Sequence, residues 1–392
     1  MLAPEIETLA WEEQLAVDDA SHRAQLAYVF ARSPFYRAKL VAAGCATAAD
    51  AGGLADLAGL PLTEKRELRE TVTPENPFGA HLCAAPEEIV RIHSTSGTTG
   101  TPSYIPLTAG DLENWVTGSA RSYAASGLTA GERLVSTYDA GPFVAGAALA
   151  AFDRIGACHV PLGTGNTERL LTAIELLGPQ AAVLTPSYAA YLIEAAADRG
   201  LDLAGSSVER VLVAGEPGGG EPAFRAMLEG GFGARVTEAM GIGDIGISLW
   251  GECEEQDGMH LGARGFVHAE LIEPETGTAL ELADGATGEL VLTHLRHRAA
   301  PSANSRTVPV SGSISSAWTK PRAPRCIPSC SSHSPQSEMP MSPIPIASVT
   351  FAPHPSSSRA RKAGSPPPGS PATSTRSTLE SRRSWFSARY AA

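Results

Sequence analysis

The spacing of apolar positions changes along the chain up to about residue 300. In the first 70 residues the periodicity is helical, because Leu15, Leu26 and Phe30 fall, together with several alanines, roughly on one helix face. Farther on, short apolar runs alternate with longer stretches of helical pattern. The runs occupy residues 132–138, 158–162, 180–186 and 209–215. Such alternation is typical of βα units around a buried sheet, so the sequence predicts an α/β fold behind an N-terminal group of helices.

Residues 265–295 follow a third pattern. There apolar and polar positions alternate with a period of two, interrupted by the turn sequences PETG and DGATG. The sequence therefore predicts a small β-rich subdomain that ends near residue 296. Much earlier, Thr63 stands just ahead of an acid-rich helical run, and we expect it to cap that helix.

The composition changes abruptly near Pro301. Residues 1–301 hold 40 of the 42 acidic residues and 19 of the 30 Lys and Arg, whereas residues 302–392 hold 11 basic residues against Glu338 and Glu380. The later segment also contains 23 Ser, 14 Pro and no Asp, and it lacks strand alternation outside the fragment MSPIPIASVTF. We therefore expect a folded domain at 1–300 and a tail without a packed core at 301–392. The tail is either a disordered basic segment or, as its composition favours, the product of a gene read out of frame.

Charge and hydropathy narrow the range of partners. The 392 residues have a net charge of −12 and are 43% apolar, which fits a globular protein and disfavours nucleic acid or an anionic membrane, since both require a basic face. No apolar run approaches the roughly 20 residues that span a bilayer, and the N-terminus has acids where a signal peptide has Lys or Arg. Six scattered cysteines are too few for a disulfide scaffold. We expect a cytoplasmic protein with a small-molecule ligand.

Hydroxyl residues and glycines crowd together directly behind the apolar run EEIVRIH. The stretch consists of Ser94, Thr95, Ser96, Gly97, Thr98, Thr99 and Gly100, followed by Thr101 and Pro102. Glycines let a backbone approach an anion closely, while N–H groups and hydroxyls donate hydrogen bonds to phosphate oxygens. The sequence thus predicts a loop that binds the phosphates of ATP, although it is not a GxxxxGK[ST] loop. The alternative is a flexible linker.

This loop and its flanks resemble a known family. STSGTTGTP is similar to the phosphate-binding signature of adenylate-forming enzymes, which include acyl-CoA synthetases, adenylation domains and luciferases. The segments SPFYR (33–37), LPLTEK (60–65), PFG (77–79) and EIVRIH (88–93) resemble, in order and spacing, the phenylacetate-CoA ligase branch. With TPSY, GEP and PETG farther on, the resemblance covers about residues 10–300. It implies the large N-terminal domain of these enzymes, with α/β subdomains and a small β-rich subdomain.

The remaining nucleotide contacts follow from the same resemblance. Gly215, Glu216 and Pro217 end an apolar run, where sheets of this class bind ligands, and similar enzymes hold adenine there. A plain Gly/Pro turn is the alternative. Met240 and Gly241 lie at positions that relatives use for the nucleotide. We therefore expect these five residues to bind ATP or AMP.

Catalysis in the resembling family rests on positioning and on neutralising phosphate charge, so Thr95 and Asp244 are the expected catalytic residues. Asp244 stands where relatives have a glutamate that holds Mg²⁺. Gly243 and Thr101 replace a hydroxyl residue and a lysine of relatives, and each missing contact would weaken ATP binding by about 1 to 3 kcal/mol.

The sequence indicates the pocket for the acid substrate and a second metal site less clearly than it indicates the phosphate loop. By resemblance, the pocket of a small aromatic acid is lined by Tyr138, Phe143, Gly146, Pro186, Ser187 and Tyr188. The aromatic residues among them fit core packing as an alternative. Cys253 and His260 share an acidic loop and would suit a structural zinc ion, but two ligands are not four, and ordinary loop residues are the favoured interpretation.

Three functions stay open at this point. The resemblance favours aryl-acid activation by ATP followed by transfer to CoA. A second candidate is a stand-alone adenylating enzyme that loads an acyl carrier protein or an amine, and a third is a non-catalytic relic that only binds nucleotide; a homodimer is compatible with each. Relatives continue from the body into an Arg-Thr-Asp segment and a mobile C-terminal domain. Neither is recognisable after Pro301, so we expect impaired activity.

Overall fold

A computed structural model describes residues 2–95, 103–138, 144–256, 258–281, 286–302, 305–314 and 350–351. The chain divides into two compact units, Met1–Thr350 and Phe351–Ala392. The first unit contains every described residue except Phe351. Most of the predicted tail at 301–392 lies outside the described residues, so its disorder and its reading frame stay predictions.

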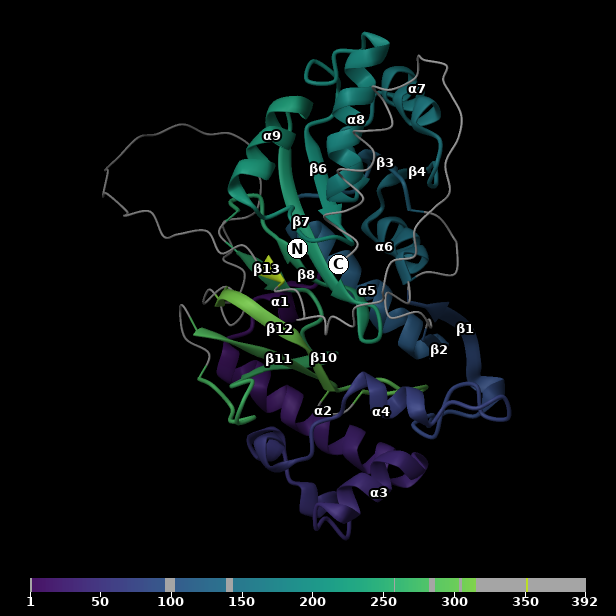
Figure 1. The fold of residues 1–392 in the computed structure, drawn as a ribbon, viewed down its shortest axis with the longest axis vertical. Helices are drawn as coiled ribbons and strands as arrows, with labels where there is room; N and C mark the ends of the chain where they lie inside the picture. The colour runs from purple at the N-terminus through teal and green to yellow at the C-terminus, as the bar shows by residue number, and fades with distance from the viewer. Residues whose placement is uncertain are drawn as a thin grey trace, which may run out of the picture. The chain divides into compact units, whose positions relative to one another are not determined.

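A seven-stranded sheet lies at the centre of this unit (Figure 1). Its strands stand in the order β4-β3-β5-β6-β7-β8-β9. Their bounds are β3 (Arg133–Ser136), β4 (Cys158–Pro161), β5 (Ala181–Leu184), β6 (Arg210–Ala214), β7 (Arg235–Ile242), β8 (Gly246–Glu252) and β9 (Met259–Leu261). The first five of that order are parallel, and β8 and β9 join antiparallel at one side. The predicted α/β fold is confirmed, because β3 to β6 occupy the four short apolar runs.

Helices cover both faces of this sheet. They are α5 (Ala109–Ala125), the 3-10 turn η4 (Val144–Ala147), α6 (Ala148–Ile155), α7 (Thr167–Leu177), α8 (Pro186–Arg199) and α9 (Pro222–Phe232). Alternate strand residues point to opposite faces: Val183 and Leu212 pack against α5 and α6, whereas Val211 and Val213 pack against α7, α8 and α9. Each fully buried Leu or Val contributes about 1.5 to 3 kcal/mol, so the two apolar layers hold the sheet rigidly between its helices.

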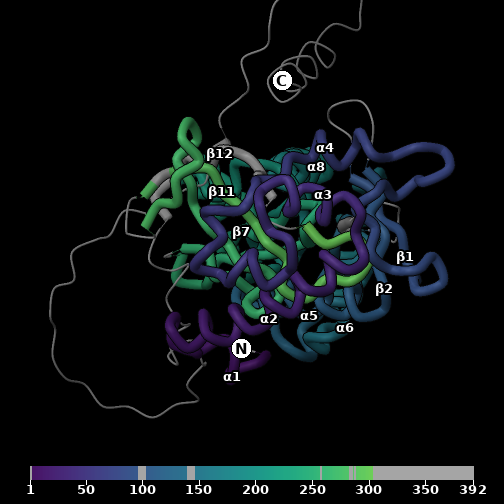
Figure 2. The backbone as a smooth tube through the Cα atoms, turned by 90° about the horizontal axis from the view of Figure 1, so that it is seen from below, coloured from purple at the N-terminus to yellow at the C-terminus, as the bar shows by residue number. Residues whose placement is uncertain are grey.

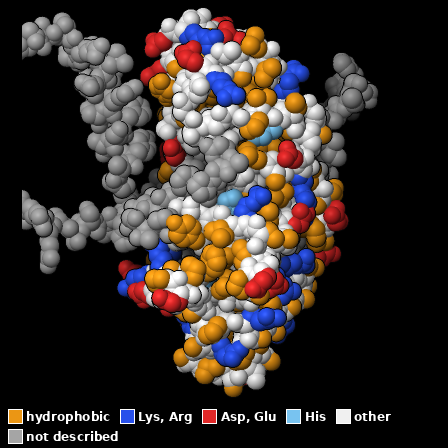
Figure 3. Space-filling view, turned by 90° about the vertical axis from the view of Figure 1, so that its right-hand side faces the viewer, with side chains coloured by type: hydrophobic (Ala, Val, Ile, Leu, Met, Phe, Trp, Pro, Cys, Tyr) orange, Lys and Arg blue, Asp and Glu red, His pale blue; other side chains and the backbone are white. Residues whose placement is uncertain are grey.

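The phosphate loop is flanked by a separate hairpin. Strands β1 (Ile89–Ser94) and β2 (Tyr104–Thr108) pair antiparallel and form a two-stranded sheet of their own. On the inner face Ile105 and Leu107 pack against Trp115 of α5, while Val90 and Tyr104 are exposed. The run EEIVRIH is therefore a strand as predicted, but it does not belong to the parallel sheet. Figure 3 shows the side on which this hairpin lies, where hydrophobic and charged side chains are interspersed.

The predicted β-rich subdomain is a second, antiparallel sheet. It contains β10 (Val267–Ile272), β11 (Ala286–His294) and β12 (Ser305–Ile314), and the two-residue strand β13 (Thr350–Phe351) spans the division between the units. Strand β12 lies beyond Pro301, where the sequence pattern predicted no strand. Because β12 pairs with β11 through backbone groups, a segment with few apolar residues can form it.

The N-terminal helices are α1 (Pro4–Glu7), α2 (Trp11–Arg32), α3 (Pro34–Ala42) and α4 (Lys65–Glu70), with 3-10 turns at Ala48–Ala51, Leu54–Gly59 and Pro86–Glu88. Helices α2, α3 and α4 lie at the opposite end of the unit from α7, α8 and α9 (Figure 1). Seen from that end, α2 and α3 lie in front of the central sheet (Figure 2). The expected cap of α4 was wrong, because Glu64 occupies the N-cap position in place of Thr63. The Glu64 N–H donates to the Glu67 carboxylate at 2.7 Å, so the acid three residues on caps the helix start.

Candidate active site

Three of the predicted binding segments meet at one edge of the central sheet. Pro186, Ser187 and Tyr188 begin α8 directly after β5, Gly215 follows β6, and Asp244 stands in the turn after β7. Because β5, β6 and β7 are neighbouring parallel strands, their carboxyl ends lie side by side. This edge is where open α/β sheets bind ligands.

A direct hydrogen bond joins two of these segments. The Ser187 hydroxyl and backbone N–H both donate to the Glu216 carboxylate, at 2.5 and 3.2 Å. Gly215 has a φ of 91°, a left-handed conformation that side chains disfavour, and it turns the chain outward so that Glu216 and Pro217 stand exposed at the edge. The predicted acid pocket and adenine loop are therefore adjacent.

Aromatic side chains surround this junction. The Tyr188 hydroxyl lies 3.0 Å from the Thr167 hydroxyl, and the Tyr188 ring is half-buried against the core below α8. Burial raises the pKa of Tyr138, and the nearby Tyr123 and Glu216 raise it further, so its hydroxyl stays protonated. Gly146 lies in η4 and is partly exposed. Phe143 falls outside the described residues, so its predicted contact with substrate stays a prediction.

The ends of the phosphate loop are held together at its neck. The Thr95 N–H donates to the Ser103 carbonyl at 3.0 Å, and the Ser103 N–H donates to the Thr95 hydroxyl at 3.1 Å. Residues 96–102 lie outside the described residues, so the predicted contacts of Ser96, Gly97, Thr98, Thr99 and Gly100 stay predictions. Ser94 ends β1 as a buried residue. The Thr95 hydroxyl still has a proton to donate while it accepts this bond.

Asp244, the expected magnesium ligand, is paired with a cation. Its carboxylate forms an ion pair with the ammonium group of Lys65, which comes from α4 far away in the sequence. Burial lowers the pKa of His81 to about 4, and Asp244 opposes that shift, so a neutral imidazole lies near the same carboxylate. Before that turn, Met240 is half-buried, and a Cβ atom at Gly241 would overlap the carbonyl oxygen of Ile247. Only glycine fits this irregular pairing of β7 and β8.

A buried charge cluster holds the chain just after the predicted adenine loop. The Arg225 guanidinium donates to the Glu252 carboxylate at 2.8 Å and to the Gly219 carbonyl at 3.2 Å. Burial raises the pKa of Glu238 to about 7, the negative Glu252 adds to this rise, and Arg225 opposes it. A backbone N–H of Gly220 also reaches the Glu238 carboxylate. The sequence analysis did not identify this cluster. Glu238, two positions before Met240, was the sign of it in the sequence around the predicted site.

Cys253 and His260 lie on one β-hairpin. His260 lies in β9 and pairs with Gly251 of β8, and Cys253 follows directly after the end of β8. Within the described parts of the chain, no group of three or more His, Cys, Asp or Glu side chains is arranged to hold a metal ion. The zinc site therefore stays a prediction.

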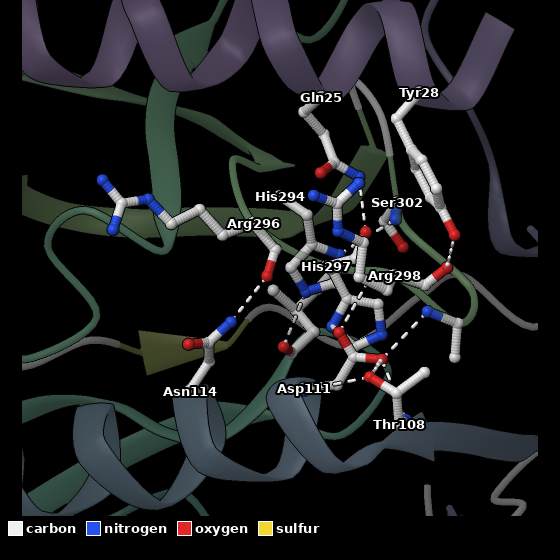
Figure 4. A network of polar contacts seen from close by, with 12 residues as sticks. Gln25, Tyr28, Thr108, Asp111, Asn114, His294, Arg296, His297, Arg298 and Ser302 are labelled. Atoms are coloured by element: carbon white, nitrogen blue, oxygen red, sulfur yellow. Dashed lines mark hydrogen bonds and ion pairs between the residues drawn. The ribbon is translucent and has the colours of Figure 1, made fainter. Parts of the chain in front are cut away.

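A separate polar network, which we call the anchor, fixes the chain as it leaves β11 (Figure 4). Asp111 of α5 is fully buried and accepts from the backbone N–H groups of Arg298 and Ala299 at 2.6 and 2.9 Å. His294 bonds the Ile245 carbonyl at 2.9 Å and accepts from the Ser302 N–H at 2.9 Å. Stacked on His294, the His297 ring lies 4.3 Å away. Here the polar groups bond chiefly to backbone, so the anchor is structural.

Comparison with known proteins gives this geometry a family context. The model of a family described as AMP-binding enzyme matches residues 17–294. Phenylacetate-coenzyme A ligases from Thermus thermophilus and Escherichia coli are 36% and 33% identical to the chain over 305 and 308 residues, which is 77% of this chain and 66% and 68% of those relatives. The chain thus spans about two thirds of the length of the curated relatives that it matches.

Solved structures show the same fold. A 2-hydroxyisobutyryl-CoA ligase in an open conformation, in complex with 2-HIB-AMP and CoA, has a TM-score of 0.71 at 25% identity and covers 77% of this chain and 66% of its own. The same ligase in the thioesterification state has a TM-score of 0.70 at 27% identity, covering 76% and 63%. In the described part of the present chain, no helix is long and apolar enough to cross a membrane.

Proposed function

The chain belongs to the family of AMP-binding enzymes, and on this basis we propose that it uses ATP to activate an aromatic or arylacetic acid, forming an acyl-adenylate and then a CoA thioester. The observation that carries the proposal is the meeting of three loops at the carboxyl edge of β5, β6 and β7. One loop offers the Tyr188 ring, the next offers the exposed Gly215–Pro217 turn, and the third offers Asp244.

The reaction needs no protein nucleophile. A carboxylate oxygen of the acid attacks the α-phosphorus of ATP; the bond from that phosphorus to its bridging oxygen breaks, and pyrophosphate leaves with the electron pair. The CoA thiolate then attacks the acyl carbonyl, and AMP departs. The chain's part is to align the reactants and to neutralise phosphate charge. We assign these roles to Thr95, at the neck of the phosphate loop, and to Asp244, in the turn after β7.

Asp244 fits the magnesium ion that such a reaction uses. Mg²⁺ binds through one or two carboxylates and the phosphates of its substrate, keeping several waters. The Asp244 side chain is 26% exposed at a turn and already holds one cation, the Lys65 ammonium. When bound, the ion would withdraw charge from the phosphates. Zinc at Cys253 and His260 is the weaker part of the proposal, because the hairpin offers two ligands.

Two other functions remain alternatives, each with a distinct chemical outcome. An enzyme that loads a carrier protein or an amine would form the acyl-adenylate without using CoA. A nucleotide-binding relic would not form it at all, and the altered residues Gly243 and Thr101 motivate that alternative. We place the protein in the cytoplasm and regard a homodimer as compatible with the proposal.

Exchange of labelled pyrophosphate into ATP tests the proposal directly. With phenylacetate or benzoate, the full 392-residue protein is expected to show acid-dependent exchange, and CoA is expected to yield a thioester detectable by mass spectrometry. Asp244→Asn should lower exchange by about 10²- to 10³-fold, whereas Asp198→Asn on the exposed face of α8 should not. A folded protein without exchange would leave only the relic, and exchange without a thioester would favour the carrier-loading enzyme.

A further inference from the structure

Helix α4 lies beside the candidate phosphate site and is held there from behind. The contact that holds it comes from α3: the Lys39 ammonium donates to both Glu67 carboxylate oxygens at 2.7 and 2.8 Å. The Glu64 N–H, which donates to the same carboxylate at 2.7 Å, caps the helix itself. The Lys39 side chain is mostly buried, which strengthens that ion pair relative to a surface pair. The Lys39–Glu67 pair therefore ties α4 to α3.

Two cations on one face of α4 contact Asp244 and Ser103, the described residue that follows the phosphate loop. Lys65 pairs with Asp244, and Arg69, four residues later, donates from Nε to the Ser103 hydroxyl at 3.2 Å. Residues four apart on a helix are neighbours on its surface, about 5 to 6 Å apart at Cβ. Lys65 and Arg69 thus link the turn after β7 to the neck that closes the loop. Arg66 points elsewhere, with a side chain 77% exposed.

The loop itself supplies no positive charge. Residues 94–103 contain only Ser, Thr, Gly and Pro, with Thr101 at the position where the P-loop of other nucleotide-binding proteins has a lysine. ATP nevertheless brings three to four negative charges, and backbone donors alone leave much of that charge uncompensated. Cations from outside the loop are needed, and those of α4 already touch its neck and its magnesium ligand.

We propose that α4 is a phosphate clamp: Lys65 leaves Asp244 when Mg-ATP binds and contacts the β- and γ-phosphates, while Arg69 holds the loop's end and adds charge. This inference rests on the proposed function. The Lys65–Asp244 pair is partly exposed on both sides, so little free energy is lost when it opens. A charge-assisted bond from the ammonium to phosphate replaces it, and the ion takes its place on the carboxylate.

The clamp acts on phosphates that AMP lacks, which separates it from a merely structural role. Lys65→Met is expected to weaken Mg-ATP binding by about 10- to 100-fold and to leave AMP binding within about twofold. Arg69→Met should lower ATP affinity less, and Lys65→Arg should restore part of it. Arg66→Met, on the same helix but away from the site, is the matched control. Isothermal calorimetry on the full chain measures all four, with circular dichroism as the check on folding.

Each outcome of this experiment decides between the two proposals. If the wild-type protein binds Mg-ATP and Lys65→Met and Arg69→Met bind it as Arg66→Met does, the clamp is wrong and the proposed function stands. Equal losses for ATP and AMP would also overturn the clamp, because they would mean a general disturbance of the site. A folded wild-type chain that binds no Mg-ATP would overturn both.

Discussion

The anchor and the site mouth are built from the same kinds of side chain and serve opposite purposes. In the anchor, Asp111 and His294 are almost completely buried and bond mainly to backbone groups. In the mouth, which we define as Lys65, Asp244, Ser187 and Glu216, the charged groups are partly exposed and pair with one another. Backbone partners cannot be exchanged, whereas a side-chain pair at the surface can open for a ligand. Burial and choice of partner therefore distinguish structure from function here.

The largest expected effect tests the anchor. Asp111→Ala removes the acceptor of three backbone N–H groups, those of Thr108, Arg298 and Ala299. Buried donors left without partners are costly, so we expect a loss of about 3 to 5 kcal/mol in the free energy of unfolding, measured by urea denaturation. Asn114→Ala removes only an exposed bond to the Arg296 carbonyl and should lose about 1 kcal/mol or less. Equal midpoints for the two variants would show that the anchor does not hold the chain after β11.

The sequence predicted features that depend on residues close together in the chain, and it missed contacts between residues far apart in the chain. The βα units were predictable, because each apolar run buries locally against the helix beside it. The three loops at the sheet edge were also predictable, since neighbouring parallel strands end together. The pairing of Lys65 with Asp244 was not, because 179 residues separate them and no local pattern reports such a contact. The same holds for the anchor, where Gln25 of α2 donates to the His297 carbonyl.

Strand pairing set a further limit on the sequence prediction. The run before the phosphate loop was recognised as a strand, but its partner was not. Ile92 pairs with Pro106 in a separate hairpin, and an apolar run alone does not say which strand it joins. Strand β12 escaped prediction for the opposite reason, since its backbone pairing needs little apolar character.

Acid is expected to act on the stability of the buried region through its histidines. Burial lowers the pKa of His22 and His268 to about 4 and that of His294 to about 3. Because these folded-state values lie below the ordinary 6.5, the unfolded chain takes up protons first as the pH falls. The stability that the neutral imidazoles provide is present above pH 6.5 and is lost as the pH falls toward 4.

The size of this acid effect can be measured from the unfolding midpoint at several pH values. Each histidine is expected to contribute about 1 to 2 kcal/mol of lost stability at pH 5. His268→Gln should flatten the dependence between pH 7 and 5 relative to the wild type. The acids Asp18 and Glu270 work in the other direction, because burial raises their pKa values to about 6 and 7, and their contribution is lost as the pH rises through those values. A dependence on pH that His268→Gln leaves identical to that of the wild type between pH 7 and 5 would contradict the assignment of a neutral, buried His268.

The smallest expected effect lies within the mouth, at the bond between the loops after β5 and β6. Ser187→Ala removes the hydroxyl that donates to Glu216, a loss worth about 1 kcal/mol, so the KM for ATP or for the acid should rise about fivefold with little change in stability. Ser207→Ala is the matched control, because its hydroxyl donates to the Pro179 carbonyl at 2.8 Å at the opposite end of the same two strands. That variant should leave both KM values unchanged. If the two variants alter KM alike, the Ser187–Glu216 bond does not shape the site, and the edge between β5 and β6 contributes to binding only through its backbone.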